Sequence, residues 1–268
     1  LMIAQPPLSR QIRDLEDELG ADLFDRSPQG LHLTSEGEVF LQHARQIMAL
    51  ADRSKEHISE MSKGLQGTIY IVSVEGHAPG LLAQWIADFR SDHPNVDYTV
   101  WNGSTDDAIY RISNGLSEIG IITEPHNAEG FFSVPVYSEP WTAIIPSSDP
   151  LASKEGDTIS MSDLKDRELI IPSRESRQAE IQSWFPNKRA KLKICCRVAH
   201  MLNAYELTRH GVGIAIYPYS EGPMLNDPDI TVKRIVDPEV RASYILIWSR
   251  ARQLSHAAEL FIENICSS

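Results

Sequence analysis

Residues 5–26 read QPPLSRQIRDLEDELGADLFDR, and residues 30–37 follow with GLHLTSEG. Two prolines open the first segment, and proline suits the first turn of a helix because its φ is fixed near the helical value and its missing N–H would be unpaired there. Gly20 tolerates positive φ and is expected to end the helix. The polar residues 26–32 then predict a β-hairpin. Four apolar residues recur at helical spacing and predict one buried face: Leu8, Ile12, Leu15 and Leu19.

The other face of this predicted helix carries polar side chains that suit nucleic acid. Hydroxyl, amide and guanidinium groups reach phosphates and base edges when a helix lies in the major groove. Periodicity alone also fits an ordinary amphipathic helix whose arginines are solvated. We expect DNA contacts from the helix and from the residues that flank the hairpin: Gln5, Pro6, Ser9, Arg10, Gln11, Arg13, Arg26 and Thr34.

The letters of this segment resemble a family motif. The run matches (S/T)QPA(L/V)SRQIxxLExxLGxxLFxR, followed by LTxAG, of the LysR-type transcriptional regulators. In that family the motif is the second helix of a winged helix-turn-helix, so the resemblance implies a first helix and a scaffold helix before Leu1, and hence an amino-terminally truncated chain. Three positions depart from the motif: Ala4, Pro7 and Gln29. The missing cap at Ala4 would lower helix stability by about 1 kcal/mol, and Gln29 removes a phosphate-seeking charge.

The 268 residues are 42% hydrophobic and 23% charged, which is the composition of an ordinary globular protein with room for two or three domains. The formal net charge of -12 would repel phosphate, so any DNA contact must be local rather than driven by bulk charge. The sequence shows no apolar run long enough to span a membrane and no leader-like opening segment. We therefore expect a cytoplasmic protein without a membrane partner.

Neither catalysis nor metal binding is indicated by the motifs. Cys195, Cys196 and Cys266 lack CxxC spacing, so neither a disulfide framework nor a zinc site is expected. Peroxide sensing by a cysteine pair, as in some relatives, is disfavoured because Cys195 and Cys196 lie in a predicted strand and point to opposite faces; we expect small buried residues instead. The sequence has no phosphate loop, HExxH, GxSxG or paired-carboxylate motif, and we expect no enzyme activity, no cofactor and no metal.

Residues 35–63 predict one long helix, because Ser35 and Glu38 fit a capping box and no proline follows. Gly64 and Gly67 then predict a hinge. The resemblance implies that this helix pairs in a homodimer, or a dimer of dimers (a tetramer), on dyad-symmetric DNA; packing on its own domain is the alternative. Its apolar or small residues follow the spacing of a coiled-coil seam: Phe40, Ala44, Ile47, Ala51, Ser54, Ile58 and Met61.

From Thr68 onward, apolar strand-like runs such as TIYIVSV, VDYTVWN and GIAIYP alternate with helical stretches. This alternation is typical of parallel sheets with crossover helices. The order resembles the two-lobed effector-binding domain of the same family, which shares its architecture with type 2 periplasmic binding proteins. The predicted α/β fold has four parts: a partial winged helix-turn-helix at 1–34, a linker (dimerisation) helix and hinge at 35–66, a first effector-binding lobe at 67–138 plus 251–268, and a second lobe at 139–250.

Ligands of open α/β sheets collect at the carboxyl ends of the strands, where helix amino termini offer unpaired N–H groups. We therefore expect a small-molecule effector to bind in a cleft between the lobes. The candidate contacts follow the predicted strands: Ser73, Glu75, Gly76, His77, Ser104, Thr105, Thr123, Pro125, Ser173, Arg174, His200 and Tyr217.

The chemistry of these residues leaves the effector open. Helix dipoles and Arg174 favour an organic anion, whereas Glu75 would suit a cationic or hydroxyl-rich ligand. Several candidates also have a structural alternative, as helix caps (Ser104 and Thr105), structural histidines (His77 and His200) or a surface ion pair (Arg174 with Glu175).

Together these features predict a DNA-binding transcriptional regulator that responds to a small-molecule effector. Double-stranded DNA and, by the resemblance, RNA polymerase are its expected partners. Closing of the lobes around the effector would change how the dimers sit on DNA. Three alternatives stay open: a solute-binding protein that delivers ligand to a transporter, an enzyme that uses the same cleft, and a truncated regulator that dimerises and senses without binding DNA.

Overall fold

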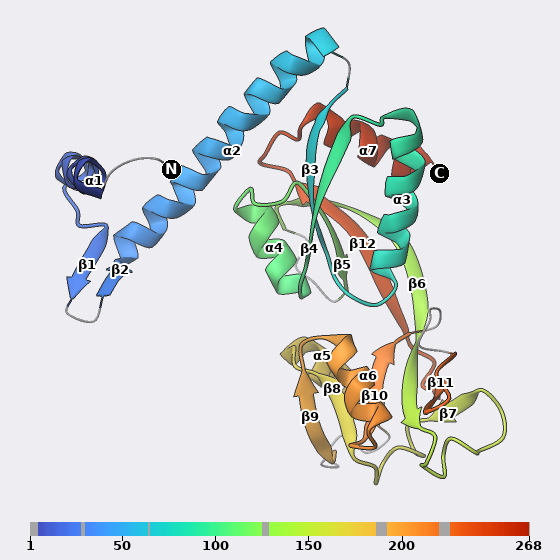
Figure 1. The fold of residues 1–268 in the computed structure, drawn as a ribbon. Coiled ribbons are helices and arrows are strands. Elements are labelled where there is room, and N and C mark those ends of the chain that lie inside the picture. The colour runs from blue at the N-terminus through green and yellow to red at the C-terminus, as the bar shows by residue number, and fades with distance from the viewer. Residues whose placement is uncertain are drawn as a thin grey trace.

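The computed structural model describes residues 5–27, 30–63, 65–124, 129–185, 192–219 and 226–267 (Figure 1). A helix and a hairpin come first, a long helix leads away from them, and two α/β lobes follow. The predicted fold class, a helix-and-hairpin module and long helix before a two-lobed α/β domain, is confirmed.

Glu16 joins the first helix to the hairpin. Its side chain is buried, and Oε1 accepts hydrogen bonds from the backbone N–H groups of Leu23 at 2.9 Å and Phe24 at 3.1 Å. Gly20, at φ +67°, makes the turn between the two elements. The elements of this amino-terminal part are α1 (Gln5–Leu19), β1 (Phe24–Ser27) and β2 (Gly30–Leu33).

The apolar face of α1 is less buried than predicted. Ile12 and Leu15 are half-buried, but Leu8 is 42% and Leu19 is 45% exposed. Among the side chains that the structure describes in this part, Leu23 is the one fully buried hydrophobic residue. The apolar face is therefore covered only near the middle of the helix.

The long helix α2 (Ser35–Lys63) has 29 residues, as predicted. Its cap is Thr34 rather than the expected pair of Ser35 and Glu38, because Thr34 Oγ1 accepts from the N–H of Gly37 at 2.9 Å and the backbone oxygen of Thr34 accepts from Glu38. A Cβ on Gly37 would lie 2.0 Å from a backbone oxygen of the turn before β1. Glycine is thus what lets the helix approach that turn.

The predicted seam of α2 is only partly covered within one chain. Phe40 and Ala44 are half-buried, but Ile47 and the neighbouring Met48 are each 67% exposed. Exposed apolar residues on a long helix favour a second surface that covers them. Three further seam side chains lie outside those that the structure describes: Ser54, Ile58 and Met61.

The first lobe is a sheet with helices on both faces. Its elements are β3 (Gly67–Ser73), α3 (Ala78–Asp92), β4 (Val96–Asn102), α4 (Thr105–Ser113), β5 (Ile119–Thr123), α7 (His256–Ser267) and parts of two long strands, β6 (Phe131–Pro146) and β12 (Arg241–Ser249). Strands β3, β4 and β5 are parallel, and the order is β4-β3-β5-β12-β6. Helices α3 and α7 pack on one face and α4 on the other.

The second lobe has the same layered design. Its elements are β7 (Thr158–Ser160), β8 (Leu169–Pro172), α5 (Glu175–Trp184), β9 (Ile194–Val198), α6 (Met201–Arg209), β10 (Ile214–Pro218) and β11 (Ile230–Asp237). Strand β9 ends the sheet order, beside β8. The expectation that both cysteines of β9 are buried is wrong for Cys195, which is exposed, while Cys196 is half-buried. An edge strand has a neighbouring strand on one side only, so fewer side chains cover it.

Strands β6 and β12 run between the lobes (Figure 1). The first part of β6 pairs antiparallel with β12, and its later residues pair with β10 and β11. Because β12 also pairs with β5, it lies in the sheet of the first lobe, whereas the sequence interpretation placed all of residues 139–250 in the second lobe. The alternation of strands and helices does not reveal which sheet a strand joins.

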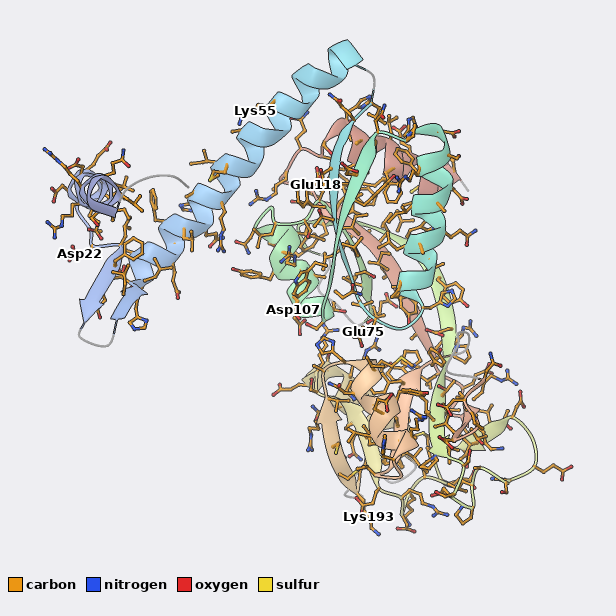
Figure 2. The ribbon with its side chains drawn as sticks, in the orientation of Figure 1. Asp22, Lys55, Glu75, Asp107, Glu118 and Lys193 are labelled. Carbon is orange, nitrogen blue, oxygen red and sulfur yellow. The ribbon has the colours of Figure 1, made fainter. Side chains whose placement is uncertain are left out.

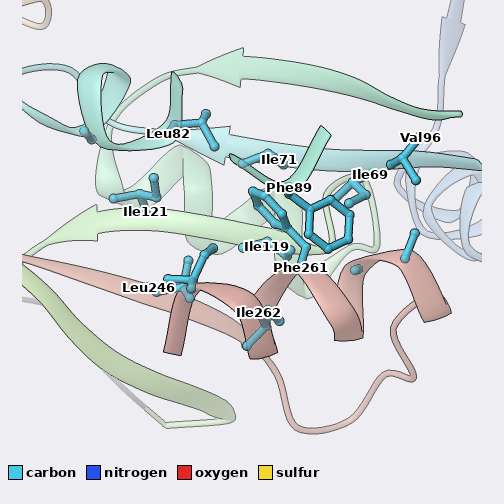
Figure 3. Close-up of a cluster of buried hydrophobic side chains, with 14 of the residues drawn as sticks. Ile69, Ile71, Leu82, Phe89, Val96, Ile119, Ile121, Leu246, Phe261 and Ile262 are labelled. Carbon is cyan, nitrogen blue, oxygen red and sulfur yellow. The ribbon is translucent and has the colours of Figure 1, made fainter. Parts of the chain in front are cut away.

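Aliphatic and aromatic side chains fill the core beneath α3 and α7 (Figure 3). Ile71 and Ile119 lie on neighbouring strands and are buried against the helices. Phe89 of α3 meets Phe261 of α7 edge to face, with ring centroids 5.2 Å apart. This core holds the strand ends of the first lobe in place.

Replacing Phe261 with alanine is expected to destabilise the protein by about 3–5 kcal/mol, because the buried ring leaves a cavity beside Phe89 and Tyr98. Chemical denaturation followed by tryptophan fluorescence measures the change. Leu202→Ala, at a side chain that is 56% exposed, is the control and should change stability by less than about 0.5 kcal/mol. Equal effects of the two variants would contradict this packing.

Candidate functional site

A cavity of about 110 Å³ lies where the two lobes meet. Strands β3, β4 and β5 of the first lobe and β8, β9 and β10 of the second end beside it, and helices α3 to α6 begin there. This is the edge at which open α/β sheets bind ligands. The lining residues are Val74, Glu75, Gly76, Gly103, Ser104, Thr105, Thr123, Trp141, Pro172, Arg174, Arg177, Ala199, Met201, Tyr217, Pro218 and Tyr244.

The structure brings most of the candidate effector residues to this cavity. Those in its lining are Glu75, Gly76, Ser104, Thr105, Thr123, Arg174 and Tyr217. Four candidates lie outside the lining: Ser73, His77, Ser173 and His200. Pro125 falls outside the described residues.

Three of these four candidates, Ser73, His77 and Ser173, are engaged elsewhere or lie at the surface. Ser73 is fully buried, and its Oγ donates to the backbone oxygen of Val74. The ring of His77 stacks on Tyr137 with centroids 3.9 Å apart, which is a structural role. Ser173 is exposed at the end of β8, and its backbone N–H bonds to β9.

Two side chains cross from one lobe to the other beside the cavity. Glu75, at the junction of the lobes in Figure 2, reaches the start of α6, where Oε2 accepts from the N–H of Met201 and Oε1 lies 3.0 Å from His200 Nδ1. Arg174 donates from Nη2 and Nε to the two carboxylate oxygens of Asp106 on α4, at 2.9 and 3.2 Å. Both contacts are of favourable kinds, a carboxylate at a helix amino terminus and a bidentate guanidinium pair.

The hydroxyls of Ser104 and Thr105 are engaged within the first lobe. Ser104 forms a capping box at the start of α4 with Asp107, which is labelled in Figure 2; Ser104 Oγ accepts from the N–H of Asp107 at 3.2 Å. Thr105 Oγ1 donates to the backbone oxygen of Thr123 at 3.2 Å. Ser104 therefore shapes the cavity wall as a helix cap, and Thr105 shapes it through its hydrogen bond to the end of β5.

Among the lining residues that sequence reasoning missed are Trp141 on β6, Tyr244 on β12 and Arg177 on α5. Trp141 and Tyr244 lie within the strands that cross between the lobes, whereas the rule of strand ends selects residues that follow a strand. Arg177 stands three residues after Arg174, and residues three apart share a helix face. That spacing is the one signal that could have found it.

The hydroxyl of Tyr244 holds a buried carboxylate at the crossing of the lobes. It donates to Glu139 Oε1 at 2.5 Å and accepts from the backbone N–H of His77 at 3.1 Å. Burial raises the pKa of Tyr244 well above its usual value, and the negative charge of Glu139 raises the pKa further. The tyrosine therefore stays protonated and keeps its role as a donor.

Tyr217 behaves in the same way on the second lobe. Its hydroxyl donates to the backbone oxygen of Val198 at 3.0 Å. Burial raises the pKa of Tyr217, and the nearby charge of Glu75 adds to the rise. A neutral, hydrogen-bonded hydroxyl thus forms this part of the wall.

The part of the cavity wall that the second lobe supplies is rich in donors. The guanidinium of Arg177 lies 5.1 Å from the ring centre of Trp141 and donates to Glu180 at 2.6 Å. In the part of the chain that the structure describes, two buried donors here have no hydrogen-bond partner, Trp141 Nε1 and Arg174 Nη1. A buried donor without a partner is unfavourable by about 1–3 kcal/mol, so an acceptor that reached either atom would stabilise the protein.

The amino-terminal helix presents the residues predicted to contact DNA. Ser9, Arg10, Gln11 and Arg13 are all exposed along α1. Thr34 is instead engaged within the chain, since Oγ1 caps α2 and also donates to the backbone oxygen of Asp22 at 2.6 Å. Three other candidates have side chains outside those that the structure describes: Gln5, Pro6 and Arg26.

Two negative findings apply to the described ranges only. None of their helices combines the length and the apolar character needed to cross a membrane. None of their His, Cys, Asp and Glu side chains form a group of three or more that could hold a metal ion.

A helix-and-hairpin module, joined by a long helix to two lobes around a cavity, defines a ligand-responsive transcriptional regulator. The family model described as "Bacterial regulatory helix-turn-helix protein, lysR family" matches residues 1–38, and the model described as "LysR substrate binding domain" matches residues 62–266. The chain belongs to the LysR family of transcriptional regulators.

Similar proteins cover nearly the whole chain. The uncharacterized HTH-type transcriptional regulator YybE of Bacillus subtilis (strain 168) is 25% identical over 268 residues, which are 100% of this chain and 90% of the relative. AlsR of the same organism is 25% identical over 260 residues, or 93% and 83% of the two chains. Among solved structures, the LysR family regulator CbnR has a TM-score of 0.75 at 24% identity, and the match covers 99% of this chain and 90% of the CbnR chain. The effector binding domain of QuiR has a TM-score of 0.67 at 19% identity, and the match covers 75% of this chain and 96% of the QuiR domain.

Tyr244→Phe is expected to lower the free energy of unfolding by about 1–3 kcal/mol at neutral pH, because buried Glu139 loses a donor. The folded-state pKa of Tyr244 is raised, so its contribution is present below the unfolded value of 10.0 and is lost as the pH rises beyond it. The difference in the free energy of unfolding between wild type and variant, here called the gap, should therefore shrink above that pH. Denaturation at neutral pH and at about pH 10.5 measures the gap, with Tyr110→Phe, 58% exposed, as control. A gap that widens with pH would contradict the assignment.

Proposed function

We propose that this regulator binds dyad-symmetric promoter DNA as a homodimer or tetramer, and that a small organic anion held between its lobes controls that binding. One observation carries the proposal. A single chain joins an exposed polar helix, a long helix with exposed apolar residues and a cavity whose wall comes from both lobes.

Placement of charge supports the DNA-binding part of the proposal. The chain has a net charge of -12, so attraction to DNA must come from particular side chains. Arg10 and Arg13 are three residues apart on α1, are both exposed and so share one helix face. CbnR, whose structure is similar to 99% of this chain, was solved in complex with its target DNA.

The proposal assigns a role to each part of the chain. Residues 1–34 bind DNA, residues 35–66 pair two copies through the exposed face of α2, and the two lobes bind the effector. RNA polymerase is a further partner of the DNA-bound form, and the cytoplasm is where the protein meets its DNA. The ligand is sensed and released unchanged, so no catalytic step is part of the proposal.

Arg10→Ala is expected to weaken binding to the preferred DNA by about 1–3 kcal/mol, because a guanidinium contact to a base edge or phosphate is lost. The preferred DNA is first selected from a random duplex library with the purified wild-type chain, and affinities are then measured by fluorescence anisotropy. Arg45→Ala removes the same charge from an exposed position on α2 and is the matched control. Equal weakening of DNA binding by the two variants would contradict the assignment of α1 as the recognition helix.

Unpaired donors support the effector part of the proposal. Arg174 Nη1 and Trp141 Nε1 are buried without a partner among the described residues, and Arg177 lies in the same wall. Donors that include guanidinium groups suit a carboxylate. In a solved structure of the same fold, the effector binding domain of QuiR is in complex with shikimate.

Arg174→Gln is expected to weaken binding of an anionic effector by about 1.5–3 kcal/mol, which is the range for hydrogen bonds to charged groups. Native mass spectrometry of the purified wild-type chain identifies a retained small molecule, and calorimetric titration then compares the variants. Arg167→Gln is the control, because it breaks a similar pair with Asp149 away from the cavity. An effector whose affinity is the same for wild type and Arg174→Gln would place the anion elsewhere.

A further inference from the structure

We propose that the interlobe cavity binds a small zwitterion of the α-amino acid class, with its carboxylate at Arg174 and its ammonium group at Glu75. The inference rests on the proposed function, in which this cavity holds the regulatory ligand. It narrows the ligand from an organic anion to a molecule that carries one charge of each sign.

Glu75 gives the cavity a negative corner. Its two oxygens meet the N–H of Met201 and Nδ1 of His200, and these contacts use two of the roughly four lone-pair directions of a carboxylate. The side chain is 32% exposed and lines the cavity, so the remaining directions can accept hydrogen bonds from a ligand. An ammonium group suits this corner because it offers three N–H donors and a full positive charge.

The helix starts around the cavity are not equally open to a ligand carboxylate. Glu75 already occupies the start of α6, and Asp107 closes the capping box at the start of α4. A second carboxylate at either start would be repelled by the first. Helix α3 has a proline in its first turn and offers one N–H fewer. The start of α5 also has a carboxylate, Glu175, in its first turn, but its N-cap is Arg174, which makes no side-chain cap and adds a positive charge there. It is therefore the start that best suits a ligand carboxylate.

Two unpaired donors also belong to residues of the cavity wall, Trp141 on β6 and Arg174 at the start of α5. Trp141 is 1% exposed, lines the cavity, and its Nε1 has no partner among the described residues. Arg174 uses Nη2 and Nε on Asp106, which leaves its buried Nη1 for another acceptor. A carboxylate is the acceptor that a guanidinium group pairs with most strongly. We therefore place the carboxylate of the ligand at Arg174, with Trp141 as a further donor residue in the same cavity wall.

The size of the cavity limits the ligand to a compact molecule. Its volume of about 110 Å³ is small beside the roughly 300–1,000 Å³ of sites for drug-sized ligands. The two charges of the ligand must therefore be only a few bonds apart, as in an α-amino acid. A dicarboxylate would bring its second negative charge to Glu75, and a simple monocarboxylate would offer Glu75 no donor.

Calorimetric titration of the dialysed full chain tests the proposal. The ligands are the standard L-amino acids, each paired with the carboxylic acid that lacks its amino group, such as L-alanine with propionate. At least one amino acid should bind about tenfold or more tightly than its partner, because only the amino acid makes a charged hydrogen bond with Glu75. If no amino acid binds, the proposal is overturned.

Glu75→Gln separates recognition of the ammonium group from the structural bridge to α6. Glutamine keeps an oxygen that accepts from Met201 but removes the charge, so the preference for the amino acid over its partner should disappear. Glu259→Gln removes a carboxylate that is 50% exposed on α7 and should keep the preference. If Glu75→Gln weakens both ligands alike, Glu75 is only a bridge and the proposal is overturned.

Failure of this inference and failure of the proposed function look different. If carboxylates bind equally well with and without the amino group, and Arg174→Gln weakens them all, the zwitterion is overturned while the anion site stands. If only an uncharged or cationic molecule is retained by the purified chain, and Arg174→Gln does not change its affinity, both are overturned.

Discussion

The pairing of β6 with β12 is the interaction on which the rest of the structure depends. The two antiparallel strands complete the sheet of the first lobe, and β6 continues into the second lobe, where it pairs with β10 and β11. The shared strands make the carboxyl ends of both sheets face one cavity. Trp141 of β6 and Tyr244 of β12 are part of its wall. A ligand that contacts these two side chains also contacts the strands that would bend if the lobes moved.

The contacts that close the lobes on each other are weaker than this ladder. Asp106 is 67% exposed where it pairs with Arg174, and Glu75 is partly exposed where it meets His200. Ion pairs that are open to solvent contribute about 0–1 kcal/mol each. The lobes can therefore separate at a modest free energy, and a ligand that binds the closed form more tightly can shift the balance between open and closed forms.

Local placement of cations matters because the chain as a whole is acidic. With a net charge of -12, it does not attract phosphates or carboxylates in general. Arg10 and Arg13 lie exposed along α1, whereas Arg174 and Arg177 lie at the start of α5 and are held by Asp106 and Glu180. The two groups of arginines thus lie on two separate surfaces, one on α1 and one in the wall of the cavity.

The sequence by itself determined most of the elements and their order, because the hydrogen bonds of helices and turns join residues that are close along the chain; it did not reveal β7 and β11. It located α1, the hairpin and α2, and the rule of strand ends located Glu75 and Arg174. Tertiary structure decided the rest. Tyr244 meets Glu139 across a separation of 105 residues, and Glu75 meets Met201 across 126. Such contacts depend on strand register, which a one-dimensional pattern does not record. The exposure of Leu19 and Cys195 depends on whether another element packs over them, and the pattern does not record that either.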